Sequence, residues 1–254
     1  YVFFPISEDE ILSYYSRYCH YSNLKTLLPP KKSFEISRDK LTLARFCRDI
    51  GIDIPKLFDD PTQLQCTDFP IIYKPRIGDG SRGIKYLESY QEYSNMVFDE
   101  SFFFQKKVRS NSNVYGGFFL MYEGTLISFY SHRRIRTFPV SGGVSVLSVS
   151  DYNHDIRRLG ERILSSLNWN GIAMIEFMRD DNDGKFKIIE INPRAWGSFI
   201  LSEFCNSKFI DNFIDLAQRP DVVTTKLISI CSLDCTVYTG KMVRWLFPWD
   251  VYLL

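Results

Sequence analysis

Two glutamates lie in one short stretch, GIAMIEFMRDDNDGKFKIIEINPR, at residues 171–194. The polar run from Asp180 to Gly184 suits a turn, so we expect a hairpin in which Glu176 and Glu190 lie opposite each other. Paired carboxylates repel each other unless a cation lies between them. Mg²⁺ is suitable, since it takes one or two protein carboxylates and completes its shell with phosphate oxygens and water. The stretch predicts a magnesium site, and a solvated strand face is the alternative.

Strand alternation adds further groups to this face of the hairpin. Successive side chains of a strand point to opposite faces, so Glu190, Asn192 and Arg194 should share one side. Ile189 and Ile191 should then point to the other side, where we expect a hydrophobic core. An amide and an arginine beside the glutamates favour a binding face over a merely solvated one.

A second stretch, FPIIYKPRIGDGSRGI at residues 69–84, leads from an apolar run to a lysine and a glycine-rich loop. Lys74 ends the apolar run, and glycines follow at positions 78, 80 and 83. The backbone N–H groups of such a loop can surround a phosphate. The alternative is a solvent-exposed hairpin turn, because short glycine-rich matches are common.

Lys40 lies at the start of a predicted helix, where a cation is unfavourable. Ser37 is a good N-cap, apolar residues recur at helical spacing and Gly51 is a natural stop, so we expect a helix over residues 38–50. The partial positive charge at a helix N-terminus disfavours a lysine there. A bound anion would resolve the conflict, and a solvated surface lysine is the alternative.

The remaining elements mix strands with helices. We expect helices at residues 8–19, 88–98, 151–167 and 197–217, and strands at 70–75, 84–87, 102–108, 117–122, 125–131 and 144–149. Glu123-Gly124 suits a tight turn. Because short turns join most neighbouring strands, the predicted fold class is α+β with largely antiparallel sheets.

Composition disfavours several classes of protein. The 254 residues include 31 Lys and Arg against 30 Asp and Glu, so no overall positive field attracts nucleic acid. We find no membrane-spanning apolar segment and no signal peptide, and we therefore expect a cytoplasmic protein. The six cysteines are scattered, Cys231 and Cys235 lack a second close pair, and the three histidines are dispersed. A disulfide framework and a structural zinc site are both disfavoured.

The order of these motifs resembles the ATP-grasp superfamily. Lys40 early in a helix, Lys74 before a glycine-rich loop, and Glu176, Glu190 and Asn192 in an EINPR hairpin follow its pattern. The spacing is most similar to the large chain of carbamoyl-phosphate synthetase and to biotin-carboxylase-like carboxylate ligases. The resemblance implies an ATP-grasp fold, in which two sub-domains with largely antiparallel sheets clamp a nucleotide.

The resemblance covers about residues 34–218 and implies a division of the chain. Residues 34–110 would form the N-terminal sub-domain, with a lid at 78–83, and residues 111–218 the C-terminal sub-domain with the metal site. Residues 1–33 look like the tail of a missing N-terminal domain. Residues 219–254 look like the start of a C-terminal extension.

Carried over to the matching positions, the resemblance implies a role for each site residue. The nucleotide would be bound by Lys40, Lys74, Gly78, Gly80, Ser81, Gly83, Gln105, Lys106 and Val108. The two lysines would contact the phosphates, the loop would close over them as a mobile lid, and backbone groups of Lys106 and Val108 would meet adenine. Glu176, Glu190 and Asn192 would hold Mg²⁺, with Mn²⁺ as an alternative. Arg194 would neutralise charge on the transferring phosphoryl group.

The chain departs from the family pattern near the expected ribose. Gln105 stands where the family often has glutamate, and VRSNSNVYGGFFL, at residues 108–120, has no clear acidic residue where a carboxylate commonly binds the ribose hydroxyls. We therefore expect a modest nucleotide affinity.

The segment HRRIRTFPVSGG, residues 132–143, is distinctive outside the general pattern. Arg133, Arg134 and Arg136 lie near the predicted strand end, and Gly142-Gly143 permits close backbone approach. These arginines could clamp a substrate carboxylate or an acyl phosphate, and we take Arg134 and Arg136 with Arg194 as catalytic candidates. An exposed basic strand edge is the alternative. The aromatic residues after the EINPR motif, Trp196 and Phe199, could line a substrate pocket, but a core position is favoured.

Together these patterns predict an ATP-dependent ligase that uses ATP and Mg²⁺. It would activate a small carboxylate as an acyl phosphate, which an amine or similar nucleophile attacks. A phosphotransferase on the same fold and a non-catalytic nucleotide-binding module are the alternatives. Small-molecule carboxylates and amines are the expected partners. The oligomeric state is left open, with a homodimer as one option.

Overall fold

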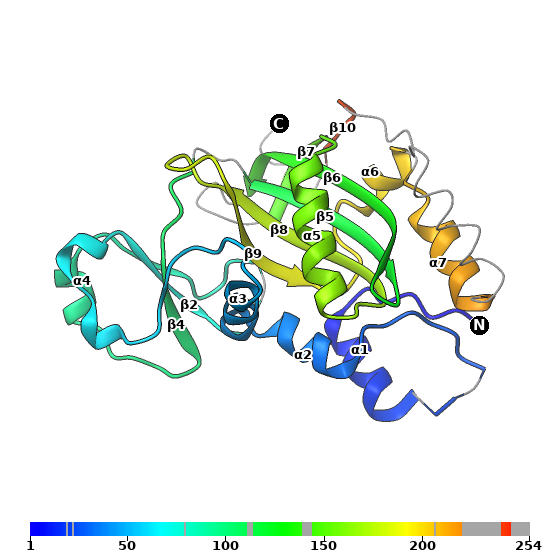
Figure 1. Ribbon diagram of the computed structural model, residues 1–254, viewed down its shortest axis with the longest axis horizontal. Coiled ribbons are helices and arrows are strands. Elements are labelled where there is room, and N and C mark those ends of the chain that lie inside the picture. Colours follow the sequence, from blue (N-terminus) through cyan, green and yellow to red (C-terminus); the bar gives the residue numbers. More distant parts are fainter. Residues whose placement is uncertain are drawn as a thin grey trace, which may run out of the picture.

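The structure is a computed structural model, and it describes residues 1–18, 20–21, 23–78, 80–110, 114–138, 144–205, 207–219 and 240–244. In this part of the chain, strands form two antiparallel sheets, with helices packed around them (Figure 1). The sheets are joined by the segment after β4, so the chain crosses from the smaller sheet to the larger one once β4 is complete. This arrangement confirms the predicted α+β class.

The smaller sheet has the strand order β1-β4-β2-β3. Its strands are β1 (Leu57–Phe58), β2 (Ile71–Pro75), β3 (Lys85–Leu87) and β4 (Phe102–Lys106), and the short helix α4 (Tyr90–Ser94) follows β3. One face buries a cluster that includes Ile71, Tyr73 and Phe104. Because side chains alternate along β2, Lys74 points to the opposite face.

The larger sheet has the order β10-β7-β6-β5-β8-β9. Its strands are β5 (Val114–Tyr122), β6 (Thr125–Phe138), β7 (Val144–Ser150), β8 (Gly171–Arg179), β9 (Phe186–Asn192) and β10 (Met242–Arg244). Helix α5 (His154–Ser166) covers one face and α7 (Phe209–Gln218) lies on the other side (Figure 1). Each face has its own hydrophobic cluster, so the central strands are buried on both sides.

Helix α5 lies very close to β5. A Cβ atom added at Gly160 would be 2.0 Å from Cζ of Phe119, far inside van der Waals contact. Both Gly160 and the Phe119 ring are buried in this interface. The absence of a side chain at position 160 therefore sets the helix-to-sheet distance.

The helix predicted over residues 38–50 is α3 (Lys40–Asp49), and a separate helix that was not predicted, α2 (Lys31–Arg38), precedes it. Asp39, with extended backbone, separates them, and its Oδ1 accepts hydrogen bonds from the N–H groups of Leu41 at 3.0 Å and Thr42 at 3.2 Å. The expected cap, Ser37, donates its hydroxyl to the Phe34 carbonyl. The prediction of Ser37 as N-cap was wrong because aspartate two residues later serves that role.

Two further predicted elements differ in extent. The long helix predicted at 197–217 is α6 (Phe199–Phe204) and α7, and Lys208 between them has the left-handed φ of +53°. Strand β6 continues to Phe138 instead of ending near 131, so the arginine segment is part of a strand. At the N-terminus, α1 (Glu8–Ser13) continues as a π-helical turn over Tyr14–Tyr18. The turn at Glu123-Gly124 is confirmed by positive φ at both residues.

A β-bulge in β9 changes the predicted side-chain pattern. Glu176 pairs with Glu190 as expected, but the next residue of β8, Phe177, pairs with Ile188, so Ile189 is the extra residue. Ile188 and Ile191 are buried in the core, whereas Ile189 lines a cavity. The expectation that Ile189 enters the core was wrong for this reason.

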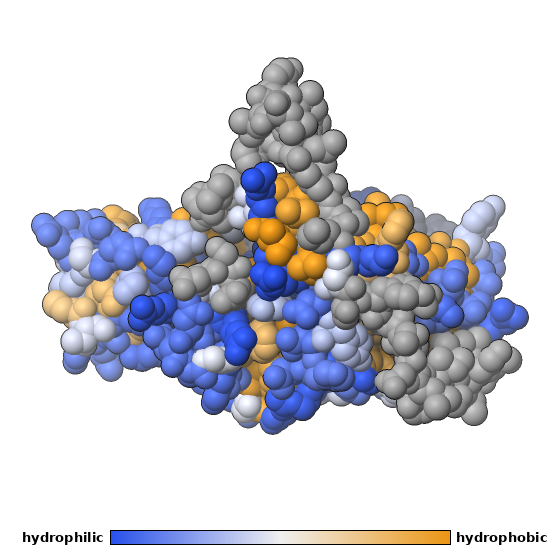
Figure 2. All heavy atoms as spheres, turned by 90° about the horizontal axis from the view of Figure 1, so that it is seen from above, coloured by the Kyte–Doolittle hydropathy of each residue, from blue (hydrophilic) through white to orange (hydrophobic). Residues whose placement is uncertain are grey.

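The surface in Figure 2 is mainly hydrophilic, with apolar side chains gathered near the middle of the molecule. Within the described residues, none of the helices has both the length and the apolar character needed to cross a membrane. Three cysteines of this part of the chain, Cys47, Cys66 and Cys205, are free. The predictions about Cys231, Cys235 and Gly142-Gly143, and nearly all of the predicted extension at 219–254, lie outside the described residues.

Candidate nucleotide-binding site

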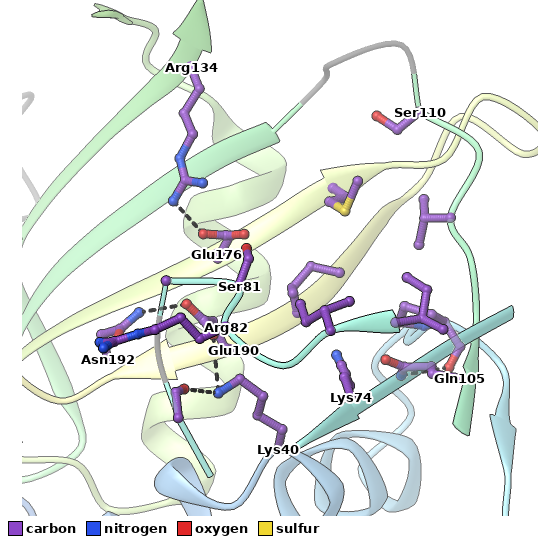
Figure 3. A pocket seen from close by; sticks show the side chains of 18 of the residues that line it. Lys40, Lys74, Ser81, Arg82, Gln105, Ser110, Arg134, Glu176, Glu190 and Asn192 are labelled. Carbon is purple, nitrogen blue, oxygen red and sulfur yellow. Dashed lines mark hydrogen bonds and ion pairs between the residues drawn. The ribbon is translucent and has the colours of Figure 1, made fainter. Parts of the chain in front are cut away.

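A cavity of about 800 Å³ lies between the two sheets. The smaller sheet contributes Ile72 and Lys74 to its lining, and the larger sheet contributes Arg134, Glu176 and Glu190. Figure 3 shows the labelled cavity residues of both sheets, with Lys40 and Asn192 at one end and Gln105 and Ser110 toward the other. The fold therefore brings together residues that are up to about 150 positions apart in the chain.

The two glutamates predicted to bind metal meet in this cavity. Glu176 forms an ion pair with Arg134 of β6. Glu190 accepts a hydrogen bond from Asn192 Nδ2 at 3.2 Å, and its other oxygen lies 3.4 Å from Lys40 Nζ. Burial raises the pKa of Glu176, and the nearby Arg134 opposes that change. Each carboxylate therefore has a cation beside it.

The donor set of this cluster fits a hard divalent cation. Glu176 and Glu190 supply carboxylate oxygens from adjacent strands, and Asn192 supplies an amide oxygen at the end of β9. That amide oxygen accepts a hydrogen bond from Arg194 Nη2 at 3.2 Å. Within the described residues, no group of three or more His, Cys, Asp or Glu side chains is arranged to hold a metal. A cation here would thus take the remaining ligands from phosphate and water, as Mg²⁺ commonly does.

Lys74 is a buried cation at the end of β2. Its side chain is in the cavity wall, and its ammonium lies over the Phe103 ring, 5.2 Å from the ring centre. Burial lowers its pKa from the usual 10.5 to about 8, while Glu190 and Glu176 partly restore it. A desolvated ammonium gains more from a phosphate than a hydrated one does, because the local dielectric is low.

The glycine-rich loop closes one side of the cavity. Gly78, Gly80 and Ser81 line it, and Gly80 and Ser81 have left-handed φ values of +61° and +60°. Gly83 does not line the cavity, since its Cα faces Pro75 and Phe102 of the smaller sheet. The neighbouring Arg82 does line it and was missed by the sequence interpretation, which read the loop for its glycines.

Lys40 connects helix α3 to this loop and to the metal cluster. Its ammonium donates a hydrogen bond to the Gly78 carbonyl and pairs with Glu190. Its backbone N–H donates to the Arg76 carbonyl at 2.8 Å. The predicted conflict with the helix N-terminus is reduced by Asp39, which caps α3 and pairs with Arg76.

The other end of the cavity holds the residues expected around adenine. The Gln105 amide donates to the Pro55 carbonyl at 3.0 Å, and the Lys106 backbone N–H donates to the Lys56 carbonyl at 2.8 Å. The Lys106 ammonium donates to the carbonyls of Asp68 and Phe69. The prediction that backbone groups of Lys106 meet adenine is therefore limited to its carbonyl, because its N–H already has a partner.

Apolar side chains that line the cavity were not identified from the sequence. They come from both sheets and from the loop, and they are Ile72, Ile84, Met174, Met178 and Ile189, beside the predicted Val108. Alternating strand patterns made these positions look like core. Their position between two sheets becomes visible only in the folded chain.

Of the three clustered arginines, the structure brings only Arg134 to the cavity lining. Arg136 is exposed, because the β6–β7 register shifts between Arg134 and Arg136. Neither Arg133 nor Arg136 is among the cavity-lining residues that the structure describes. Arg136 is therefore not placed where a catalytic residue of this cavity would lie. Of the three arginines, Arg134 is the one that stays a candidate.

The aromatic residues after the EINPR motif have different positions. Trp196 is buried in the hydrophobic cluster, as the favoured core reading predicts, and it also borders the cavity. Phe199 packs against Phe4 in the same cluster and does not line the cavity. His132 borders the cavity too, and burial lowers its pKa to about 3, so its ring is neutral.

A second cavity of about 450 Å³ lies behind the metal cluster. The N-terminal segment lines it with Ser7 and Glu8, and α2 lines it with Arg38, which pairs with Glu8 at 2.7 Å. It also shares five residues with the first cavity, namely Lys40, Gly78, Glu190, Asn192 and Arg194. The shared residues, which include Glu190 and Asn192 of the metal cluster, therefore separate two chambers.

Comparisons with known proteins bear on the family and the fold of the chain. The sequence model of the ATP-grasp domain matches residues 37–198. No curated protein sequence matches the chain.

Among solved structures, the chain is similar to the biotin carboxylase of Campylobacter jejuni in complex with β-γ-ATP. The TM-score is 0.69 at 17% identity, over 85% of this chain and 54% of that one. N5-carboxyaminoimidazole ribonucleotide synthetase of Thermotoga maritima gives 0.61 at 17%, over 82% and 55%. D-alanine–D-alanine ligase of Bacillus anthracis complexed with ATP gives 0.53 at 16%, over 79% and 72%. The chain spans about half the length of the first two, and at these identities the likeness concerns the fold.

Proposed function

Since this chain belongs to the ATP-grasp family, we propose that it is an ATP-dependent ligase that activates a carboxylate as an acyl phosphate for attack by an amine. The observation that carries the proposal is the charged cluster in the first cavity. Glu176 and Glu190 face each other there, and two lysines, Lys74 and Lys40, line the same cavity, with Lys40 pairing with Glu190. This combination suits a polyphosphate and its divalent cation.

The residues of the cavity would have different roles in phosphoryl transfer. Lys74 and Lys40 would contact the phosphates, and the loop at 78–83 would cover them and exclude water. Glu176, Glu190 and Asn192 would hold Mg²⁺, with Mn²⁺ as an alternative, and when bound the ion would neutralise charge on the phosphates. Arg194 and Arg134 would hold the reacting oxygens in position. Cys205 takes no part, because it is buried in the hydrophobic cluster.

The second cavity supports a reaction between two bound molecules. A nucleotide in the first chamber and a carboxylate in the second would meet at Arg194, which borders both. Arginine suits this position because its planar guanidinium can bind a carboxylate and a phosphate oxygen. The amine would then displace phosphate from the acyl phosphate.

The remaining expectations stay part of the proposal. We propose the division into sub-domains at 34–110 and 111–218, with 1–33 and 219–254 belonging to neighbouring regions. Small carboxylates and amines are the proposed partners, a cytoplasmic location is expected, and a homodimer stays open. Similarity to the large chain of carbamoyl-phosphate synthetase remains a prediction.

Trapping with hydroxylamine tests the reaction class. The full chain would be incubated with ATP, Mg²⁺, hydroxylamine and a panel of amino acids and small carboxylates. A ligase releases an acyl phosphate that hydroxylamine converts to a hydroxamate, so we expect a hydroxamate that requires both ATP and the correct carboxylate. A stable phosphate ester without hydroxamate would show a phosphotransferase. ATP binding without any turnover across the panel would point to a binding module.

A further inference from the structure

The nucleotide cavity contains one carboxylate that the metal cluster does not use. Among the described lining residues the carboxylates are Glu176, Glu190 and Glu88. Glu88 directly follows β3 on the smaller sheet. A carboxylate only accepts hydrogen bonds, so its partner on a nucleotide must be an N–H or O–H group. The nucleoside offers such donors at the exocyclic amine of adenine and at the ribose hydroxyls.

Strand register indicates which of these donors lies near Glu88. On the cavity face of the smaller sheet, Lys74 marks the phosphate end. Ile72 precedes it by two residues in β2 and lies opposite Tyr86 and Gln105. One step beyond the Ile71–Leu87 pair come Pro70 and Glu88. Four residues of strand separate Pro70 from Lys74, a distance of about 13 Å. Because ribose lies between phosphate and base, this outermost level corresponds to the far edge of the base.

The neighbours of Glu88 hold its carboxylate in place. Lys107 Nζ lies 2.8 Å from Oε1, and the same ammonium lies over the Tyr86 ring at 5.3 Å. The backbone N–H of Glu88 donates to Glu92 at 2.9 Å. Since Lys107 binds Oε1, Oε2 is the oxygen that can turn to a ligand. The Glu88 side chain is 58% exposed at the rim, so the effect of one hydrogen bond there should be moderate.

Two N–H groups at this end already have acceptors. The Gln105 amide N–H and the Lys106 backbone N–H donate to the carbonyls of Pro55 and Lys56. Both N–H groups are donors, so neither can accept a hydrogen bond from an amine. The Lys106 carbonyl can accept one of the two amine hydrogens, and Glu88 and the Gln105 amide oxygen are side-chain acceptors that line the cavity here for the second.

We propose that Glu88 accepts a hydrogen bond from the exocyclic amine of adenine and so selects adenine over purines that lack this amine. The inference rests on the proposed nucleotide site. It also implies discrimination against guanine, since a carbonyl oxygen at that position would face the carboxylate without a hydrogen between them. Glu88 does not take the place of the acidic residue sought after β4 for the ribose, because it follows β3 and its proposed target is the base.

A thermodynamic cycle between protein and ligand tests this assignment. Calorimetry on the full chain would give dissociation constants for ATP and for purine riboside triphosphate, which differs from ATP only by lacking the amine. Wild type, Glu88→Ala and the exposed control Glu100→Ala would be compared, with 2′-deoxyATP and 3′-deoxyATP as further ligands. We expect Glu88→Ala to weaken ATP by about three- to tenfold, to leave purine riboside triphosphate within twofold, and to leave the ribose preferences unchanged. Glu100→Ala should match wild type.

Each alternative result has a distinct meaning. Equal weakening of ATP and purine riboside triphosphate would overturn the assignment, because it indicates a general electrostatic or structural effect. Loss of discrimination against the deoxy nucleotides would overturn it in favour of a ribose contact. Failure of wild type to bind any of the nucleotides would overturn the proposed function itself, and the inference with it. Normal ATP binding with an unchanged preference in Glu88→Ala would overturn only the inference.

Discussion

Glu176 of β8 lies directly opposite Glu190 of β9, and each carboxylate is contacted by a cation from a distant segment, Arg134 for the first and Lys40 for the second. A like-charged cross-strand pair is destabilising by itself, so the two cations offset the repulsion in the free protein. A divalent cation would compete with them for the same oxygens. Binding of metal and release of Arg134 and Lys40 toward phosphate or substrate are therefore expected to be linked.

Glu190→Gln should remove the magnesium dependence of ATP binding, because the amide loses the negative charge that attracts the ion. The dissociation constant for ATP would be measured by calorimetry with Mg²⁺ and with EDTA, and we expect similar values for the variant but different values for wild type. Without metal, the free energy of unfolding should change by less than about 1 kcal/mol, since relief of repulsion offsets the lost Lys40 contact. Glu161→Gln serves as the control. A large loss of metal-free stability would assign Glu190 a structural role instead.

Lys74→Met should weaken ATP binding at least tenfold, or about 1.4 kcal/mol, because a charge-assisted contact in a desolvated cavity is lost. The matched control is Lys85→Met, an exposed lysine of β3 outside the cavity lining. Its affinity should equal that of wild type. Equal affinities for all three proteins would remove Lys74 from the site.

ATP affinity should fall as the pH rises through about 8. Burial lowers the Lys74 pKa to about 8 in the free protein, whereas bound phosphate favours the ammonium and raises it, so binding takes up a proton in this range. The stability of the free protein has the opposite trend. Between about 8 and 10.5 the unfolded chain binds more protons at this group, so its contribution to stability rises with pH. Calorimetry in buffers of different ionisation enthalpy would detect the proton uptake, and its persistence in Lys74→Met would assign it to another group.

Arg134→Ala should lower hydroxamate formation by about tenfold and leave ATP affinity within about threefold, because its proposed contact is with the reacting oxygens. Arg136→Ala is the control, since Arg136 is exposed and outside the cavity lining. Initial rates of hydroxamate formation would be compared at saturating ATP. A similar loss in Arg136→Ala would reinstate the wider arginine cluster that the sequence suggested.

Gly160→Ala should destabilise the protein by about 1–3 kcal/mol, because the added methyl group would overlap the Phe119 ring. Urea unfolding of Gly160→Ala and of Arg158→Ala, on the exposed side of the same helix, would separate this packing effect from helix propensity. An unchanged midpoint in Gly160→Ala would mean that the helix can move away from β5 without cost.

The hairpin and the glycine-rich loop could be predicted because local rules decide them. A polar turn between two apolar runs sets the pairing of Glu176 with Glu190, and alternation places Asn192 on their side. The helix boundary at Asp39 could not be placed as well, since Ser37 and Asp39 are both good caps and tertiary contacts select one. Arg76, which pairs with Asp39, belongs to a segment 37 residues away.

Two features of the site that depend on contacts between distant segments were missed or misplaced. Glu88 lies beside an unremarkable strand in the sequence, and only the sheet order β4-β2-β3 brings it to Lys107 and the cavity. Arg136 was included because it is close to Arg134 in sequence, but an irregular β6–β7 register separates them in space. Proximity in sequence is a poor guide wherever a bulge interrupts the alternation.

The extra residue in β9 lets two consecutive side chains, Ile189 and Glu190, border the same cavity. A regular strand would have buried the first of them in the core. The apolar surface of Ile189 therefore lies next to the Glu190 carboxylate without any intervening residue, which in the proposed site is the boundary between base and phosphates. Ile189 can also change size without leaving a void among the packed side chains, so it is a position where evolution or a designer could reshape nucleotide preference at little cost in stability.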